Sequence, residues 1–334
     1  MAEVSLLDLS KSFGATAAVR NVSMTIPDGA FVVLLGPTGA GKTTTLRLIA
    51  GLETPDAGDM RIDGVSVLQH TPAQRDVAMV FQQYSLYPHM TVRDNLAFPL
   101  RSPILAWPED RIRAKVDEVA EVLRIAHKLD NRATQLSGGE MQRVSIGRAL
   151  VRAPRIYLMD EPLSSLDAKL RSDLRIELKR IHAELGATFL YVTHDQIEAM
   201  TMATHVGVLD QGRLVQFGTP RQIYEDPVST YVASRLGQPR INILPANAFG
   251  AAPPGAVLMG LRPEHIRQGE GVPATVRRLE RLGDQTRLHL RFGPHEMVTL
   301  GEPHTPLEAG DVIAIRPENP LWFDATGQRL ETRR

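Results

Sequence analysis

Gly36-Pro37-Thr38-Gly39-Ala40-Gly41-Lys42-Thr43 is the stretch that decides how this chain folds. It follows the apolar run Phe31–Leu35 and opens a segment with helical spacing, so we expect a turn between a buried strand and a helix. Its glycines allow backbone N–H groups to point at an anion, Lys42 adds a positive charge, and the Thr43 hydroxyl can bind Mg²⁺. Spacing and context predict a loop that binds the β- and γ-phosphates of a nucleotide, known as a P-loop. The alternative is a glycine-rich turn without a ligand.

Two adjacent acids, Asp160 and Glu161, end the apolar run Ile156–Met159. Acids in this position are often only solvated, or they cap a helix. Downstream of a P-loop they have a chemical use, because hydrolysis needs a carboxylate in the Mg²⁺ shell and a group that acts on water. We therefore predict that Asp160 helps to hold Mg²⁺ and that Glu161 orients or deprotonates the attacking water.

The sequence Leu-Ser-Gly-Gly-Glu at residues 136–140 precedes an expected helix, Met141–Leu150. Ser-x-x-Glu is the pattern of a capping box, in which Ser137 caps the helix and Glu140 reaches back to it. A helix N-terminus flanked by glycines is also an anion site. Capping and phosphate binding are compatible, so we predict both.

Gln82 and His194 each follow an expected strand, Val77–Val80 and Thr188–Val192 respectively. A single Gln or His is usually structural. In an open α/β sheet, however, ligands bind at the carboxyl ends of the strands, where the P-loop and the two acids are also expected. This convergence indicates one shared site.

Helical patterns alternate with these short apolar runs through the first two thirds of the chain. The segment Glu109–Leu129 is one example, and the residues that share its apolar face are Ile112, Val116, Val119 and Leu123. The alternation predicts an α/β domain with a mainly parallel sheet, antiparallel strands beside it and a helical subdomain at about residues 88–150.

The pattern changes after about Leu236, where short strands bounded by Pro and Gly replace the helical spacing. The strands expected there are Ala256–Met259, Ala274–Leu279, Thr286–Phe292 and Val312–Arg316. They predict a small all-β barrel or sandwich, with a linker near Gly237-Gln238-Pro239. The predicted domains are therefore residues 1–236 and residues 237–334.

The composition narrows the function classes. Lys plus Arg and Asp plus Glu both total 38, so the net charge provides no long-range attraction to nucleic acid or to anionic lipid. The chain has no cysteine, which excludes disulfides and thiolate metal sites and suits a reducing compartment. No stretch approaches the roughly 18 apolar residues of a membrane-spanning helix, and Glu3 and Asp8 argue against a signal peptide.

The order of these motifs resembles that of the ATPase subunits of ABC (ATP-binding cassette) transporters, over residues 3 to about 236. The resemblance includes the loop Ser164–Asp167, and it implies ATP and Mg²⁺ as ligands and catalytic roles for Glu161, His194 and Lys42. It implies Thr43, Gln82 and Asp160 as metal ligands. The nucleotide-binding residues that it implies are Phe13, Gly36, Pro37, Thr38, Gly39, Ala40, Gly41, Lys42, Thr43, Thr44, Gln82, Ser137, Gly138, Gly139, Glu140, Asp160 and Asp167.

The resemblance also implies a dimer, because ATP bound at Lys42 of one subunit would be closed over by Ser137 and Gly139 of the other. Two positions depart from the family pattern. Glu140 stands where Gln is usual and brings a negative charge near the triphosphate. Phe13 would stack on adenine where Tyr is more familiar, and a core position for Phe13 is the alternative.

Two further stretches, Val80–Thr91 and Gly260–His265, resemble the carbohydrate importer branch of the family, which includes the maltose and glycerol-phosphate importer ATPases. That branch carries an OB-type (TOBE-like) β domain after the ATPase, as expected here for residues 237–334. The implied partners are a second ATPase, identical or paralogous, two permease subunits contacted by Tyr84–His89, and an extracytoplasmic solute-binding protein. The implied location is the cytoplasmic face of the inner membrane. The cargo is a sugar, a polyol, glycerol or glycerol phosphate.

Three other functions stay open at this stage: a soluble ABC ATPase of DNA repair or translation, an importer of a non-carbohydrate solute, and a nucleic-acid-binding OB module. The first usually interrupts the cassette with coiled coils or zinc modules, which this sequence lacks. The last needs stacking aromatics along a basic groove. After Tyr231 the aromatic residues are Phe249, Phe292, Trp322 and Phe323, so no nucleic-acid partner is expected.

Overall fold

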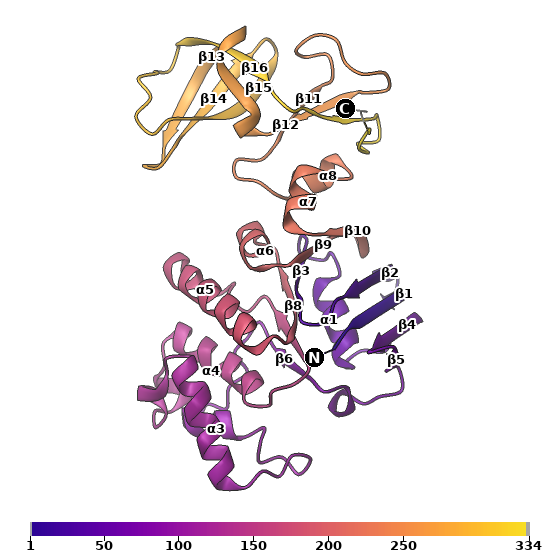
Figure 1. Cartoon of the computed structure of the whole chain (residues 1–334), viewed down its shortest axis with the longest axis vertical. Coiled ribbons are helices and arrows are strands. Elements are labelled where there is room, and N and C mark those ends of the chain that lie inside the picture. Colours follow the sequence, from indigo (N-terminus) through magenta and orange to yellow (C-terminus); the bar gives the residue numbers. More distant parts are fainter. Residues whose placement is uncertain (1, 332–334) are drawn as a thin grey trace. The chain divides into compact units, whose positions relative to one another are not determined.

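The structure is a computed structural model and describes residues 2–331. Figure 1 follows the chain from its N-terminus in indigo to its C-terminus in yellow. The contacts between residues divide the chain into two compact units, Met1–Pro220 and Arg221–Arg334. Residue 1 and residues 332–334, which the predicted domains include, lie outside the described part.

The first unit is built on a six-stranded sheet with the order β10-β9-β3-β8-β7-β6. Its strands are β3 (Phe31–Leu35), β6 (Val77–Val80), β7 (Ile156–Asp160), β8 (Thr188–Thr193), β9 (His205–Asp210) and β10 (Arg213–Gly218). All neighbours pair in parallel except β9 and β10. Every residue of β3, β7 and β8 is buried, as the continuous apolar runs require. The predicted mainly parallel sheet is confirmed.

A second, antiparallel sheet of the first unit has the order β2-β1-β4-β5. Its strands are β1 (Val4–Phe13), β2 (Thr16–Ile26), β4 (Ala57–Ile62) and β5 (Val65–Ser66). Its inward residues, such as Val4 and Leu6, join the same core as Leu34, Leu46 and Leu190. The two sheets therefore share one hydrophobic core around helix α1.

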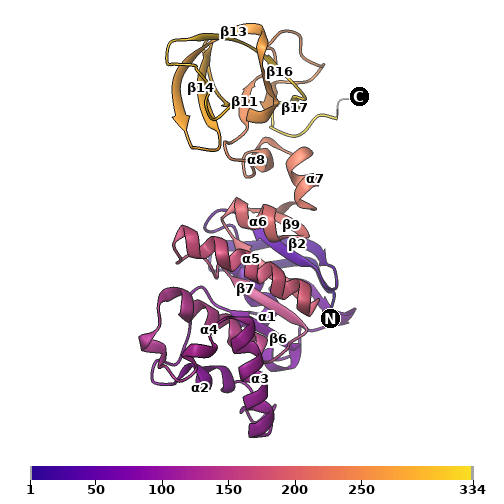
Figure 2. The ribbon, with the colours of Figure 1, turned by 60° about the vertical axis from the view of Figure 1, so that its left-hand side comes forward.

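The α-helices of the first unit are α1 (Lys42–Ala50), α2 (Val92–Ala97), α3 (Glu109–Val122), α4 (Gly138–Leu150), α5 (Ala168–Leu185) and α6 (Gln196–Met202). The short 3₁₀ helices are η1 (Pro72–Arg75), η2 (Ala126–Lys128) and η3 (Ala133–Gln135). Figure 2 shows α2, α3 and α4 together in one group. The four apolar positions predicted to share a face of α3 are buried, Leu123 included.

Two helix boundaries differ from the sequence prediction. The helix expected over Glu109–Leu129 ends at Val122, because Arg124 takes a left-handed conformation with φ of 56° and the chain continues as η2. Helix α4 begins at Gly138 rather than at Met141, since Ser137 caps it and the two glycines already form its first turn.

Two short helices precede the strands of the second unit: α7 (Pro220–Glu225), which starts at the boundary between the units, and α8 (Thr230–Ala233). One antiparallel sheet has the order β11-β12-β17 and the other β15-β14-β13-β16. The strands are β11 (Asn242–Pro245), β12 (Leu258–Leu261), β13 (Ile266–Arg281), β14 (Thr286–Phe292), β15 (His295–Gly301), β16 (Val312–Pro317) and β17 (Leu321–Phe323), with the 3₁₀ helix η4 (Pro263–His265) after β12. The predicted all-β character is confirmed, although β11, β15 and β17 were not predicted.

The contact boundary at Pro220 lies earlier in the chain than the predicted limit at residue 236. Arg262, which is 2% exposed, explains the difference. Its guanidinium donates hydrogen bonds to the carbonyl oxygens of Tyr224 at 2.7 Å, of Ala233 at 3.3 Å and of Leu236. These bonds fasten α7 and α8 to the β unit, although no local pattern in residues 221–236 marks them as part of it. Where the functional ATPase domain ends stays a prediction.

Within residues 2–331, no helix combines the length and the apolar character needed to cross a membrane.

Candidate functional site

The P-loop joins β3 to α1, as the sequence predicted. Gly41 precedes the helix with a φ of 95°, and a Cβ atom there would lie 2.3 Å from the Ala18 carbonyl oxygen, so only glycine fits. The Lys42 ammonium donates to the carbonyl oxygens of Gly36 at 2.9 Å and Pro37 at 3.1 Å. The loop thus curls around the lysine at the N-terminus of α1, where free N–H groups and the helix dipole favour an anion.

Asp160 ends strand β7 next to this loop. The Thr43 hydroxyl donates a hydrogen bond of 2.8 Å to Asp160 Oδ1. Burial raises the pKa of Asp160, with a smaller contribution from the Glu161 charge, while the bond from Thr43 acts in the opposite direction. Hydroxyl and carboxylate oxygens side by side are the ligands that Mg²⁺ prefers. The residues present therefore fit a magnesium ion.

Glu161 follows Asp160 and has a φ of 44°, which is unusual for a residue other than glycine. Its N–H donates to the Val192 carbonyl at 3.1 Å, and its own carbonyl accepts from the N–H and the hydroxyl of Ser164 at 3.2 and 2.9 Å. Three backbone-directed bonds thus hold this strained conformation. They fix the direction in which the carboxylate projects.

The Glu161 carboxylate lies between Lys42, the first residue of α1, and His194, which directly follows β8. Its Oε1 is 3.3 Å from the Lys42 ammonium, and its Oε2 is 2.9 Å from His194 Nδ1. The Glu161 side chain is 16% exposed and the His194 side chain 59% exposed, so a nearly buried carboxylate is paired with a solvent-accessible imidazole. Of the three residues that the family resemblance made catalytic, Glu161 therefore contacts both of the others.

Gln82 and Phe13 are the two predicted site residues that come from the ends of β6 and β1. Both are exposed; Gln82 follows β6, and Phe13 ends β1 with 47% of its surface accessible. The Lys11 ammonium lies 5.4 Å from the centre of the Phe13 ring. The exposure of Phe13 excludes the core position considered as an alternative. Their roles toward a nucleotide stay predictions.

The Ser137–Glu140 stretch forms the N-terminus of α4. The predicted capping box is present: Glu140 N–H donates to Ser137 Oγ at 3.4 Å, and Ser137 N–H donates to a Glu140 carboxylate oxygen at 2.8 Å. A Cβ atom on Gly139 would lie 2.2 Å from a methyl carbon of Leu170 in α5. Asp167 caps that helix by accepting from Leu170 N–H at 3.0 Å. In the described residues, the hydrogen bonds and ion pairs of this group do not reach Lys42 or Glu161.

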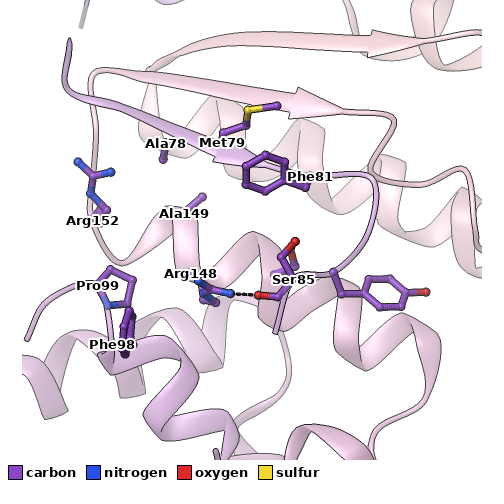
Figure 3. A pocket seen from close by; sticks show the side chains of 11 residues that line it. Ala78, Met79, Phe81, Ser85, Phe98, Pro99, Arg148, Ala149 and Arg152 are labelled. Atoms are coloured by element: carbon purple, nitrogen blue, oxygen red, sulfur yellow. Dashed lines mark hydrogen bonds between the residues drawn. The ribbon is translucent and has the colours of Figure 1, made fainter. Parts of the chain in front are cut away.

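A groove of about 250 Å³ lies beside Gln82, and its lining includes Tyr84 and Ser85 from the stretch predicted to contact the permease. Met79 of β6 and Phe81, which directly follows that strand, line one side, and Phe98 and Pro99, which follow α2, line another (Figure 3). Arg148 of α4 also lines it and donates a hydrogen bond to the Ser85 carbonyl. The lining comes from three separate stretches of chain, residues 78–85, 98–99 and 145–152, so the tertiary fold is needed to form the groove.

The residues of the predicted contact region Tyr84–His89 have different surroundings. Tyr84 and Ser85 line the groove. The Tyr87 ring instead lies 4.5 Å from the Phe98 ring, and the Tyr87 N–H donates to the Asn95 side chain at 2.9 Å. Tyr87 is therefore partly a packing residue, whereas His89 is exposed.

The fold and the site define a P-loop ATPase domain followed by a small all-β domain. Residues 19–164 match the family described as "ABC transporter", and residues 259–323 match the TOBE domain. The chain is 42% identical to the sn-glycerol-3-phosphate import ATP-binding protein UgpC of Bordetella bronchiseptica, over 99% of both chains. It is 42% identical to the sulfoquinovosyl glycerol transport ATP-binding protein SmoE of Agrobacterium fabrum, over 98% of this chain and 99% of that protein.

Solved structures agree with this relationship. The dimeric MJ0796, a bacterial ABC transporter cassette, is 29% identical with a TM-score of 0.59, over 65% of this chain and 99% of that one. A post-hydrolysis dimer of MJ0796 bound to ADP and phosphate is 30% identical, with the same TM-score of 0.59 and the same coverage of 65% and 99%. The chain belongs to the ATP-binding subunits of ABC importers, which bind and hydrolyse ATP to energise solute uptake and work as dimers with membrane permease subunits.

Proposed function

We propose that this chain hydrolyses ATP with Glu161 as the residue that orients and deprotonates water and Lys42 as the residue that binds the phosphates. The observation that carries this proposal is the position of the Glu161 carboxylate, 3.3 Å from Lys42 and 2.9 Å from His194. A base must lie within hydrogen-bond reach of the proton it accepts, close to the phosphate under attack. A carboxylate next to the phosphate-binding lysine meets this condition.

His194 is the proposed partner of Glu161. An Nδ1–H tautomer donates to Oε2 and keeps the carboxylate directed toward the phosphates, while the exposed imidazole limits access of bulk water. A phosphate that binds at Lys42 competes with Glu161 for the ammonium. ATP binding therefore loosens the Lys42–Glu161 pair and leaves the carboxylate to His194 and the water.

Thr43 and Asp160 are the proposed ligands of Mg²⁺, and the exposed Gln82 is a third candidate. When bound, the ion neutralises charge that develops on the phosphates. The remaining P-loop residues, including Thr38 and Thr44, contribute backbone N–H groups around the phosphates. Phe13 is the proposed adenine contact, because it offers an exposed ring at the end of β1.

The helix start at Ser137 is the proposed second half of the ATP site, supplied by the opposite subunit. The similarity to dimeric cassettes supports this arrangement. In the part of the chain that the structure describes, no hydrogen bond or ion pair joins this helix start to Lys42. Ser137 and Gly139 would close over the triphosphate bound to the partner, and Asp167 would lie next to the same interface. A monomer then has two incomplete half-sites.

The groove beside Gln82 is the proposed docking site for a short amphipathic helix of the permease. Its apolar walls include Phe81 and Phe98, which are 39% and 43% exposed, and Arg148 and Arg152 add positive charge. An apolar groove with a basic floor fits a helix with an apolar face and an acidic residue. Because the groove adjoins Gln82 and Tyr84, a partner seated there can sense the nucleotide site.

We infer that the cargo is glycerol-related, since the relatives named above are ATP-binding proteins of sn-glycerol-3-phosphate import and of sulfoquinovosyl glycerol transport. A solute-binding protein outside the membrane would deliver it, and this chain would sit at the cytoplasmic face. The test reconstitutes the chain with its permease subunits and binding protein in liposomes loaded with ATP. Uptake of radiolabelled sn-glycerol 3-phosphate that requires ATP and an intact Glu161 is the expected result. Uptake of maltose alone would contradict the glycerol assignment, and uptake without ATP would contradict the ATPase role.

A further inference from the structure

Glu140 turns its carboxylate back onto the start of helix α4. The oxygen Oε2 accepts hydrogen bonds from the Ser137 N–H at 2.8 Å and from the Ser137 hydroxyl at 2.9 Å. The other oxygen, Oε1, lies 3.2 Å from the ammonium of Lys128 in η2. One carboxylate therefore takes two donors of the helix start and pairs with a lysine from a different element.

This carboxylate competes with a phosphate in two ways. The hydrogen bond from the Ser137 backbone N–H lowers the pKa of Glu140, so the side chain is charged at neutral pH. A charged carboxylate repels a triphosphate, whereas the glutamine usual at this position would not. In addition, the Ser137 hydroxyl that would donate to a phosphate already donates to Glu140. An unpaired Glu140 would therefore weaken the second half of the ATP site.

We propose that Lys128 is a positioning residue of the ATP site, which neutralises Glu140 so that the Ser137 helix start can receive the triphosphate of the partner subunit. The inference rests on the proposed function, in which this helix start closes over the partner's ATP. The Lys128 and Glu140 side chains are 29% and 21% exposed, so water screens the pair only in part. The pair explains how this chain keeps Glu140 in a site built for phosphate.

The test measures ATP hydrolysis against ATP concentration in four variants. Lys128→Met keeps the apolar stem and removes the charge, and it should raise KM for ATP by about two- to five-fold with little change in kcat. Lys128→Arg should restore the wild-type KM. Glu140→Gln keeps the capping geometry without the charge and should lower KM. In the double variant Lys128→Met/Glu140→Gln, KM should equal that of Glu140→Gln alone, because no carboxylate remains to be neutralised.

Lys115→Met is the matched control, since it removes an ion pair of similar length on α3, between Lys115 and Glu118 at 2.7 Å. It should leave KM unchanged. The second readout is ATP-driven dimerisation in the Glu161→Gln background, measured by analytical ultracentrifugation. Adding Lys128→Met to this background should weaken the dimer. The proposal is overturned if Lys128→Met changes KM equally with Glu140 and with Gln at position 140, or does not change it. If Glu161→Gln forms no ATP-dependent dimer, the composite site itself is contradicted. If the dimer forms with the same affinity with and without Lys128→Met, only this inference is contradicted.

Discussion

Nδ1 of His194 lies 2.9 Å from Oε2 of Glu161, and the two residues directly follow the neighbouring strands β8 and β7. Parallel pairing of these strands brings their carboxyl ends to one edge of the sheet. The contact joins an exposed residue to a nearly buried one, so movement of the imidazole changes the surroundings of the carboxylate.

Replacing Glu161 by Gln should slow ATP hydrolysis by about 10²- to 10⁴-fold while ATP still binds, because the amide keeps the shape but cannot accept the proton. Binding without hydrolysis should hold the dimer closed. Size exclusion should therefore show a dimer with ATP and a smaller species without it. If the chain pairs only with a paralogous ATPase, this dimer should appear once that partner is added. Near-normal turnover of Glu161→Gln would remove its assignment as the catalytic base.

Lys42→Ala should reduce ATP affinity by roughly 10- to 150-fold, since a hydrogen-bonded charge at the phosphates is lost. The measurement is equilibrium titration with a fluorescent ATP analogue. Lys115→Ala provides a control for the loss of one lysine charge on the surface. If Lys42→Ala bound and hydrolysed ATP like the unmodified protein, the P-loop would not be the phosphate site.

Phe81→Ala should reduce transport in the reconstituted system while leaving ATP hydrolysis by the isolated chain intact. The side chain lines the groove and is 39% exposed, so its removal costs little packing. Ile176→Ala is the control, because Ile176 is an exposed apolar residue on α5 with 71% of its surface accessible. Tyr87→Ala should instead lower melting temperature and activity together, because its ring packs against Phe98. Equal transport by Phe81→Ala and Ile176→Ala would argue against a partner in the groove.

Glu198 should make folding stability depend on pH. It is 2% exposed in α6 and accepts a hydrogen bond of 2.9 Å from the Tyr191 hydroxyl, and burial raises its pKa above the ordinary 4.5. The folded state then holds the proton more tightly than the unfolded state, so this residue lowers stability progressively as pH rises from about 4.5 through the raised value. Urea unfolding across that range should show Glu198→Gln gaining stability relative to the unmodified protein as pH increases. The exposed control Glu184→Gln should not, and parallel curves for all three would disprove the assignment.

Shortening the chain after Pro220 should preserve ATP binding better than shortening it after Leu236. A chain that ends at Leu236 keeps Ile223, Val232 and Leu236, all fully buried in the intact protein, but loses Arg262 and the strands around it. Exposed apolar residues in α7 and α8 should cause association on size exclusion. Equal behaviour of the two shortened chains in ATP titration and thermal melting would show that α7 and α8 do not depend on the β unit.

The sequence alone was sufficient to predict those features that depend on residues close together in the chain. The glycine spacing before Lys42 predicted the strand, loop and helix around it, because a tight turn with positive φ requires glycine at defined positions. Strands β3, β6 and β14 were predicted with their observed limits, since each is an uninterrupted or alternating run between turn residues. The capping box of Ser137 and Glu140 was likewise visible, as both partners lie within one helical turn.

Only the tertiary structure decided which of these local features meet. It placed Glu161 between Lys42 and His194, paired Glu140 with Lys128, and fastened α7 and α8 to the β unit through Arg262. It also assembled the antiparallel sheet of β1, β2, β4 and β5, whose bulged strands follow no single period. These contacts join residues far apart in the chain, so they depend on strand order, register and packing of the whole core, which no local pattern encodes.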